Sequence, residues 1–133
     1  MNGKYSYADI AAEDLLAARQ MLKAKLYNHA SRLCQQYIEK VLKQCIHERG
    51  CNETDMLLMH SHKLVRIAAR CAELCGFVFS RDDTAFFREL TDYYFDTNYP
   101  GENYIQVSEH EAHQAYEKTL AFQASYESTL CQA

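Results

Sequence analysis

One continuous apolar stripe constrains this chain more than any other feature. From residue 28 to residue 48, apolar side chains recur every three to four positions, the spacing that places them on one face of an α-helix. The stripe consists of Ala30, Leu33, Cys34, Tyr37, Ile38, Val41, Leu42, Cys45 and Ile46. It predicts a long helix, from about Asn28 to Glu48, at the centre of the core.

The rest of the chain also favours helices. Only 1 Pro and 4 Gly interrupt the 133 residues, too few for many short strands and their turns. Short connections between successive helices make them antiparallel neighbours. We therefore expect a single domain over residues 1–133, with an all-α fold: an up-and-down antiparallel four-helix bundle with a short additional helix.

The ends of these helices are predicted by capping residues and glycines. A Ser followed three residues later by an acidic residue is typical of a helix start, and Gly of a helix end in the left-handed conformation. The predicted starts are Ser6, Asn52 or Thr54, Ser80 and Ser108, and the predicted ends are Gly50 for the long helix and Gly76 for the helix after it.

Composition excludes several classes of protein. The net charge of −4 gives no footprint for non-specific nucleic-acid binding. No apolar run approaches the roughly 20 residues that span a bilayer, and no export signal is visible, which predicts a cytoplasmic protein. The 6 Cys should then be thiols, and those in apolar stripes should pack in the core. Without a CxxC or another metal-binding spacing, we expect neither a metal nor a cofactor.

Three segments carry side chains that could recognise a ligand. The first is the polar face of the long helix, QQYIEKVLKQ, where Glu39 and Lys43 form an i,i+4 pair expected on the outside. The second is HSHK, residues 60–63, for which a satisfied or exposed His is the simplest interpretation. The third is YYFDTNYPG, residues 93–101, for which two interpretations remain open: an aromatic pocket for a base or partner, or a loop held by buried Tyr rings.

Together, three pieces of the sequence resemble HEPN domains, small helical domains of many prokaryotic proteins. They are ADIAAEDLLAARQML, SRLCQQYIEKVLKQCI, and His62 with Leu64 followed by a Tyr-rich segment that ends in Tyr99-Pro100. The resemblance implies a bundle of four to five helices that is often dimeric. It further implies a nucleotidyltransferase partner of the minimal type and a nucleotide ligand. Some family members are metal-independent ribonucleases with an Arg followed four to six residues later by His.

This chain departs from the ribonuclease pattern, because none of its arginines precedes a His at that interval. Asn98 also stands where family members often have Arg before Tyr-Pro. The expected function is therefore a non-catalytic HEPN module, nucleotide-binding or the partner of a nucleotidyltransferase, in a toxin–antitoxin-like or defence context. No catalytic residue is assigned. The alternatives are a homodimeric structural domain and a divergent ribonuclease that depends on His62. The resemblance and the residue chemistry together assign the ligand site to Lys40, Lys43, His62, Tyr94, Asn98 and Tyr99.

Overall fold

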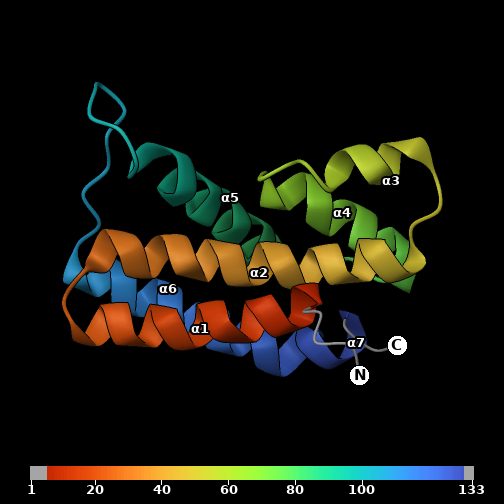
Figure 1. Cartoon of the computed structure of the whole chain (residues 1–133), viewed down its shortest axis with the longest axis horizontal. Helices are drawn as coiled ribbons and strands as arrows, with labels where there is room; N and C mark the ends of the chain where they lie inside the picture. Colours follow the sequence, from red (N-terminus) through yellow and green to blue (C-terminus); the bar gives the residue numbers. More distant parts are fainter. Residues whose placement is uncertain (1–5, 131–133) are drawn as a thin grey trace.

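All secondary structure in the computed structural model, which describes residues 6–130, is helical. Figure 1 shows α2 running through the middle, with α1 and α6 below it and α3, α4 and α5 above. This confirms the predicted all-α class. The elements are α1 (Tyr7–Lys23), α2 (Tyr27–Arg49), α3 (Glu53–Leu58), α4 (Leu64–Cys75), α5 (Arg81–Asp96), α6 (Glu109–Phe122), the π-helical turn η1 (Gln123–Glu127) and α7 (Ser128–Leu130).

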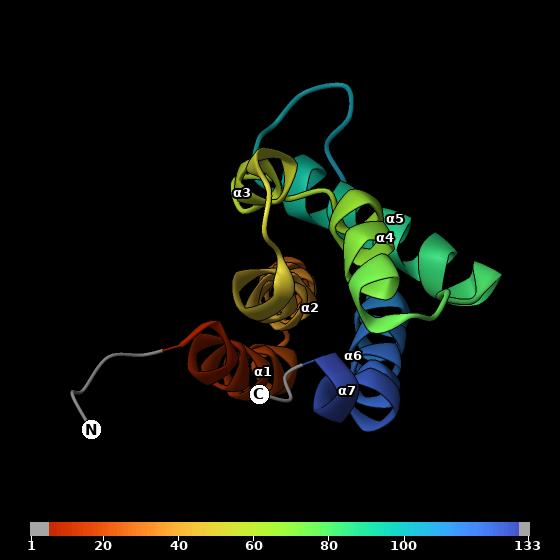
Figure 2. The same ribbon diagram turned by 90° about the vertical axis from the view of Figure 1, so that its right-hand side faces the viewer.

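Helix α2 is the centre of the molecule. The end-on view of Figure 2 shows the other helices arranged around it, and α2 contacts α1, α4, α5 and α6. Its observed span is within one residue of the predicted one at either end. Its apolar stripe is almost entirely buried, as the periodicity requires. Within residues 6–130, no helix is long and apolar enough to cross a membrane.

The helix predicted from Asn52 to Gly76 is wrong as a single element, because the structure divides it into α3 and α4. The backbone of Lys63 is extended, and its N–H donates to the Ser61 hydroxyl at 3.1 Å instead of continuing a helical ladder. The α3 turn is also anchored from outside, since Arg70 of α4 holds the Asp55 carboxylate at 2.6 Å. The break places His62 in a connection that faces α2.

Most of the predicted helix starts are confirmed by side-chain caps. The Ser6, Asn52 and Ser108 side chains each accept a hydrogen bond from the backbone N–H of the residue three positions later. The acidic side chain of that later residue in turn accepts a hydrogen bond from the backbone N–H of the capping residue. Ser80 also caps its helix, but the carboxylate of Asp83 accepts from the Tyr126 hydroxyl. That bond ties the start of α5 to η1.

The two glycines that end helices do so differently. Gly76 adopts the predicted left-handed conformation, with φ of 78°. Gly50 does not: its φ is −74° and its ψ is 150°, so the left-handed prediction is wrong there. Gly50 is nevertheless needed, because a Cβ would lie 2.7 Å from the Ile46 carbonyl oxygen. The closeness of the Ile46 carbonyl of α2 itself, and next of the Asp55 side chain of α3, requires Gly50, and the dihedral angle does not.

Candidate ligand-binding site

A surface cavity of about 400 Å³ lies where the first turns of α2 meet the end of α5. Met21 of α1 and Leu33 of α2 form part of its wall. Its polar side chains come from α2, from the last turn of α5 and from the residues that follow α5, and they are His29, Arg32, Gln36, Tyr94 and Asn98. Two of these five, Tyr94 and Asn98, belong to the predicted ligand site.

Arg32 gives this cavity its positive charge. Its Nη1 donates to the carbonyl oxygen of Thr97 at 3.0 Å and to the Thr97 hydroxyl at 2.8 Å. A guanidinium carries five N–H donors, so some of them remain unused after the bonds to Thr97 and His29. No carboxylate lines the cavity, and among residues 6–130 Arg32 has no ion pair. Thr97 therefore fixes the guanidinium in position without neutralising it.

The tautomer of His29 follows from the same contact. Arg32 Nη2 lies 2.7 Å from His29 Nδ1, and a guanidinium can only donate. Nδ1 must therefore accept, which leaves the ring proton on Nε2. His29 thus places an N–H donor beside the cation.

A buried ladder of polar side chains runs along α2 beside the cavity. Gln35, Glu39 and Lys43 are four residues apart, and each is at most 4% exposed. Glu39 accepts from Gln35 Nε2 at 2.9 Å and from Lys43 Nζ at 2.8 Å. The prediction of an outward-facing Glu39–Lys43 pair is therefore wrong, because the α3–α4 connection covers this side of α2.

His62 joins the ladder to the aromatic wall of the cavity. Its Nδ1 lies 3.0 Å from Glu39 Oε1, and its carbonyl accepts from Gln35 Nε2 at 3.0 Å. Its ring packs against the Tyr94 ring, with centroids 4.9 Å apart. Burial raises the pKa of Tyr94, and the charges of Glu39 and Tyr99 add to that rise. Tyr94 is therefore a neutral phenol at physiological pH.

The other predicted site residues are more scattered. Lys40 donates to Asp14 of α1 at 2.8 Å and to Gln36 at 2.9 Å, so its charge is paired at the edge of the cavity. Asn98 Nδ2 donates to the Tyr94 carbonyl at 2.5 Å, which caps the end of α5. Tyr99 is 75% exposed and projects beyond the cavity.

The segment after α5 is held by a side chain that the sequence did not single out. Asn28 of α2 accepts from the Val107 N–H at 2.8 Å and donates to the Tyr104 hydroxyl at 3.0 Å. Tyr99 and Tyr104 are themselves exposed. The interpretation of a loop held by buried Tyr rings is therefore wrong for these two residues, since the polar side chain of Asn28 holds the loop.

The predicted ligand site contains neither Arg32 nor His29. The position before Tyr99-Pro100, where family members often have Arg, holds Asn98 in this chain. In three dimensions the cation comes from α2, a distant part of the chain. The available signal was the pair of basic side chains three residues apart near the start of the long helix, which places them on one face.

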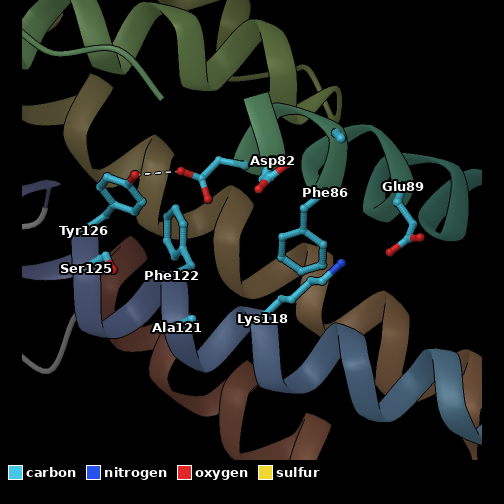
Figure 3. A pocket seen from close by; sticks show the side chains of 10 residues that line it. Asp82, Phe86, Glu89, Lys118, Ala121, Phe122, Ser125 and Tyr126 are labelled. Atoms are coloured by element: carbon cyan, nitrogen blue, oxygen red, sulfur yellow. Dashed lines mark hydrogen bonds between the residues drawn. The ribbon is translucent and has the colours of Figure 1, made fainter. Parts of the chain in front are cut away.

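A second cavity, of about 520 Å³, lies between α5 and the α6–η1 segment. Figure 3 shows Phe86, Phe122 and Tyr126 along it, with Lys118 reaching toward the Phe86 ring. Its acidic side chains are Asp82, Asp83 and Glu89. Since these outnumber the single Lys, this cavity repels phosphate, and the cavity at Arg32 is the better site for an anion.

Comparisons with known proteins agree with the helical architecture. A sequence model described as the HEPN domain matches residues 6–127, nearly the whole chain. No curated protein and no solved structure matches the chain.

Proposed function

The chain belongs to the HEPN domain family, and from this premise we propose that it is a non-catalytic module that binds the phosphate groups of a nucleotide at Arg32. The single observation that carries the proposal is a fixed guanidinium in an open cavity without a carboxylate. Arginine with unused donors suits the planar, bidentate geometry of phosphate oxygens. His29 Nε2 and the Gln36 amide would add donors at the same wall.

The base of the nucleotide would lie toward α5. Tyr94 offers an aromatic ring at the cavity wall, and base–aromatic stacking contributes about 1–3 kcal/mol per base. Asn98 stands beside it and Tyr99 lies just beyond. His62 and the ladder below it support the Tyr94 ring from behind. In this proposal Lys43 has a structural role, because Glu39 already neutralises its buried charge.

Binding can be tested by titration calorimetry with a panel of nucleoside mono-, di- and triphosphates, with and without magnesium. Arg32→Gln should weaken binding about ten-fold or more, because a charge-assisted hydrogen bond contributes about 1.5–3 kcal/mol. Arg81→Gln is the matched control, since Arg81 is exposed at the opposite end of α5 and should leave binding unchanged.

Two results would contradict the proposal. One is the absence of binding across the whole panel. The other is binding that Arg32→Gln leaves as tight as in the wild type, which would move the ligand elsewhere. Because Arg32 also holds Thr97, each variant is first compared with the wild type in thermal unfolding.

We also propose that the module acts with other chains, as a homodimer and as the partner of a minimal nucleotidyltransferase in a toxin–antitoxin-like or defence context. Large exposed apolar side chains support a protein contact: Met56 and Leu57 of α3 are 69% and 71% exposed. Sedimentation velocity would detect a dimer, and Leu57→Lys should dissociate it if α3 lies in the contact. Copurification from the native host would identify a nucleotidyltransferase. A strict monomer that captures no partner would contradict this part.

One observation favours a second candidate, a metal-independent ribonuclease. His62 presents Nδ1 to the buried carboxylate of Glu39, an arrangement that orients an imidazole for proton transfer at Nε2. Lys43 and Gln35 share that carboxylate, which weakens its effect on His62. This candidate requires RNA cleavage in the presence of a chelator that His62→Ala abolishes. Intact RNA at high protein concentration would exclude it.

A further inference from the structure

A cluster of thiols lies on the side of α2 that packs against α4. Cys45 of α2 is fully buried, whereas Cys75, the last residue of α4, is partly exposed. Their sulfur atoms are 3.8 Å apart. Cys71, one turn earlier in α4, donates its S–H to the Leu42 carbonyl at 3.1 Å. The packing of α4 on α2 thus brings two unbonded sulfurs together, one of which solvent can reach.

A cation lies directly beside this sulfur pair. Arg49 Nη1 donates to Cys75 Sγ at 2.7 Å, a charge-assisted contact that favours a thiolate. The neighbouring thiols of Cys71 and Cys75 and the charge of Arg49 lower the pKa of Cys45 to about 7, against the opposing effects of burial and of the Glu48 charge. Burial and the charge of Cys45 raise the pKa of Cys75. The two sulfurs therefore share one negative charge beside Arg49 near neutral pH.

We propose that Cys45 and Cys75 are a redox modification site, at which a peroxide converts the two thiols into a reversible disulfide bond between α2 and the end of α4. The arrangement has the parts that such a site needs: a reachable sulfur, a cation beside it and a second sulfur in contact. Closing the bond to about 2.05 Å requires the sulfurs to approach each other by side-chain rotation at the end of α4.

The chemistry balances with peroxide as the only oxidant. With the shared charge on Cys75, the sulfur that solvent can reach, its thiolate attacks one peroxide oxygen and the O–O bond breaks. Cys75 becomes a sulfenic acid, and the hydroxide that leaves takes the proton of Cys45 to become water, which makes Cys45 a thiolate. The Cys45 thiolate then attacks the Cys75 sulfur, the S–O bond breaks, and the second oxygen leaves as hydroxide. A proton from the medium converts this second hydroxide to water. Two thiols are oxidised and one peroxide is reduced.

The disulfide would enclose the segment that carries His62. Residues 45 and 75 flank α3, the connection at 59–63 and α4. Oxidation would therefore restrict this whole segment and raise the temperature at which the chain unfolds. Oxidation would also remove the Cys75 thiolate that accepts a hydrogen bond from Arg49. The other end of the same guanidinium, Nη2, donates to the Thr129 carbonyl of α7 at 3.3 Å.

The test treats the reduced wild-type protein with hydrogen peroxide and measures its mass without reductant. We expect the loss of two hydrogen atoms per chain, one cross-linked peptide pair containing Cys45 and Cys75, and full reversal by dithiothreitol. Cys51→Ser is the matched control, because Cys51 is exposed and lies outside the sulfur cluster. This variant should form the same bond, whereas Cys75→Ser should form none.

Several outcomes would overturn the proposal. They are a bond between any other pair of cysteines, cross-linking between chains, or a gain of oxygen at Cys75 without a disulfide. Unchanged thiols after exposure to excess peroxide would also overturn it. The peptide map of the wild type decides between them even where a Cys variant folds poorly.

Discussion

At the scale of single residues, the most consequential pair is Glu39 with Lys43. Both side chains are almost completely buried, at 4% and 6% exposure, and their charges are 2.8 Å apart. Taking two charges out of water costs several kcal/mol per ion, which their mutual attraction offsets only while both are present. Removing one partner therefore leaves the other as an uncompensated buried charge.

We predict that Glu39→Gln lowers the free energy of unfolding by about 3–5 kcal/mol. The Lys43 ammonium would lose its counter-charge, and His62 would lose its carboxylate partner. Urea denaturation measures the change. Asp14→Asn breaks the more exposed pair with Lys40 and should cost at most about 1 kcal/mol. Equal effects of the two substitutions would contradict the structural role of the buried pair.

The second residue-scale prediction concerns acid stability. Arg70 holds the Asp55 carboxylate with both its Nε and Nη2, and this lowers the pKa of Asp55 from 3.8 to about 2. Because the folded pKa is the lower one, the ionised carboxylate stabilises the fold above about pH 4, and this contribution disappears as the pH falls toward 2. The difference in unfolding free energy between the wild type and Asp55→Asn should shrink over that interval. A difference in unfolding free energy that stays the same as the pH falls would contradict this prediction.

Single residues also show where the sequence stops being informative. Periodicity assigned Glu39 and Lys43 to the polar face of a helix, and correctly paired them. It could not show that a later connection covers that face, since burial depends on which segment packs there. Arg32 was missed for the same reason: its neighbours Tyr94 and Asn98 are more than sixty positions away in the sequence.

At the scale of elements, the two helix-ending glycines are required for different reasons. Gly76 has a positive φ and open space around it, whereas Gly50 has an ordinary φ and no space. Asn tolerates the left-handed conformation better than Ala does. A substitution by Asn therefore distinguishes a dihedral constraint from a steric one.

We predict that Gly76→Ala costs about 1–2 kcal/mol in unfolding free energy and that Gly76→Asn costs less. At Gly50, Ala should cost about 1–3 kcal/mol, and Asn should give no relief because it brings the same Cβ. Thermal unfolding of the four variants measures both differences. A Gly50→Asn variant clearly more stable than Gly50→Ala would show that the dihedral angle, and not the Ile46 carbonyl, limits this site.

The division of the third predicted helix has a tertiary cause. Its apolar positions continue at helical spacing from Leu57 to Leu74, so the pattern alone favours one helix. The chain instead turns after α3, where Asp55 is anchored to Arg70 and where Gln35 binds the His62 carbonyl. Polar contacts across the fold decide this break, and no local signal such as Pro or Gly marks it.

At the scale of the whole molecule, α2 is the element that all the larger helices share. The other helices surround it, whereas α3 packs on the outside and exposes Met56 and Leu57. Local opening is easiest where few apolar side chains are buried. Different helices of the fold should therefore open with different free energies.

We predict that native-state hydrogen exchange is slowest at the centre of α2, around residues 37–42, and fastest among the helices in α3. Buried apolar side chains surround the first segment, while α3 has only one short turn anchored by Asp55. Mass spectrometry of exchanged peptides measures the order. Protection of α3 equal to that of α2 would indicate that another chain covers it.

The all-α class was predictable because it depends on local periodicity and on the scarcity of breakers. The packing around α2 was predictable only in outline, since a helix pattern shows how wide the apolar face is and not which partners cover the rest. The chain's membership of the HEPN family agrees with the run of polar residues on α2. That run turns out to be largely internal.

The buried ladder on α2 has a consequence for how this domain can vary. Gln35 and Glu39 contact His62 on the α3–α4 connection, and Lys43 pairs with Glu39. Each additional residue along the helix rotates the side-chain direction by about 100°. A one-residue insertion between Ala30 and Gln35 would turn the whole ladder away from His62 and bring apolar side chains opposite the His62 carbonyl. Insertions and deletions should therefore accumulate in the connections, while the length of α2 between its first turns and Lys43 stays fixed.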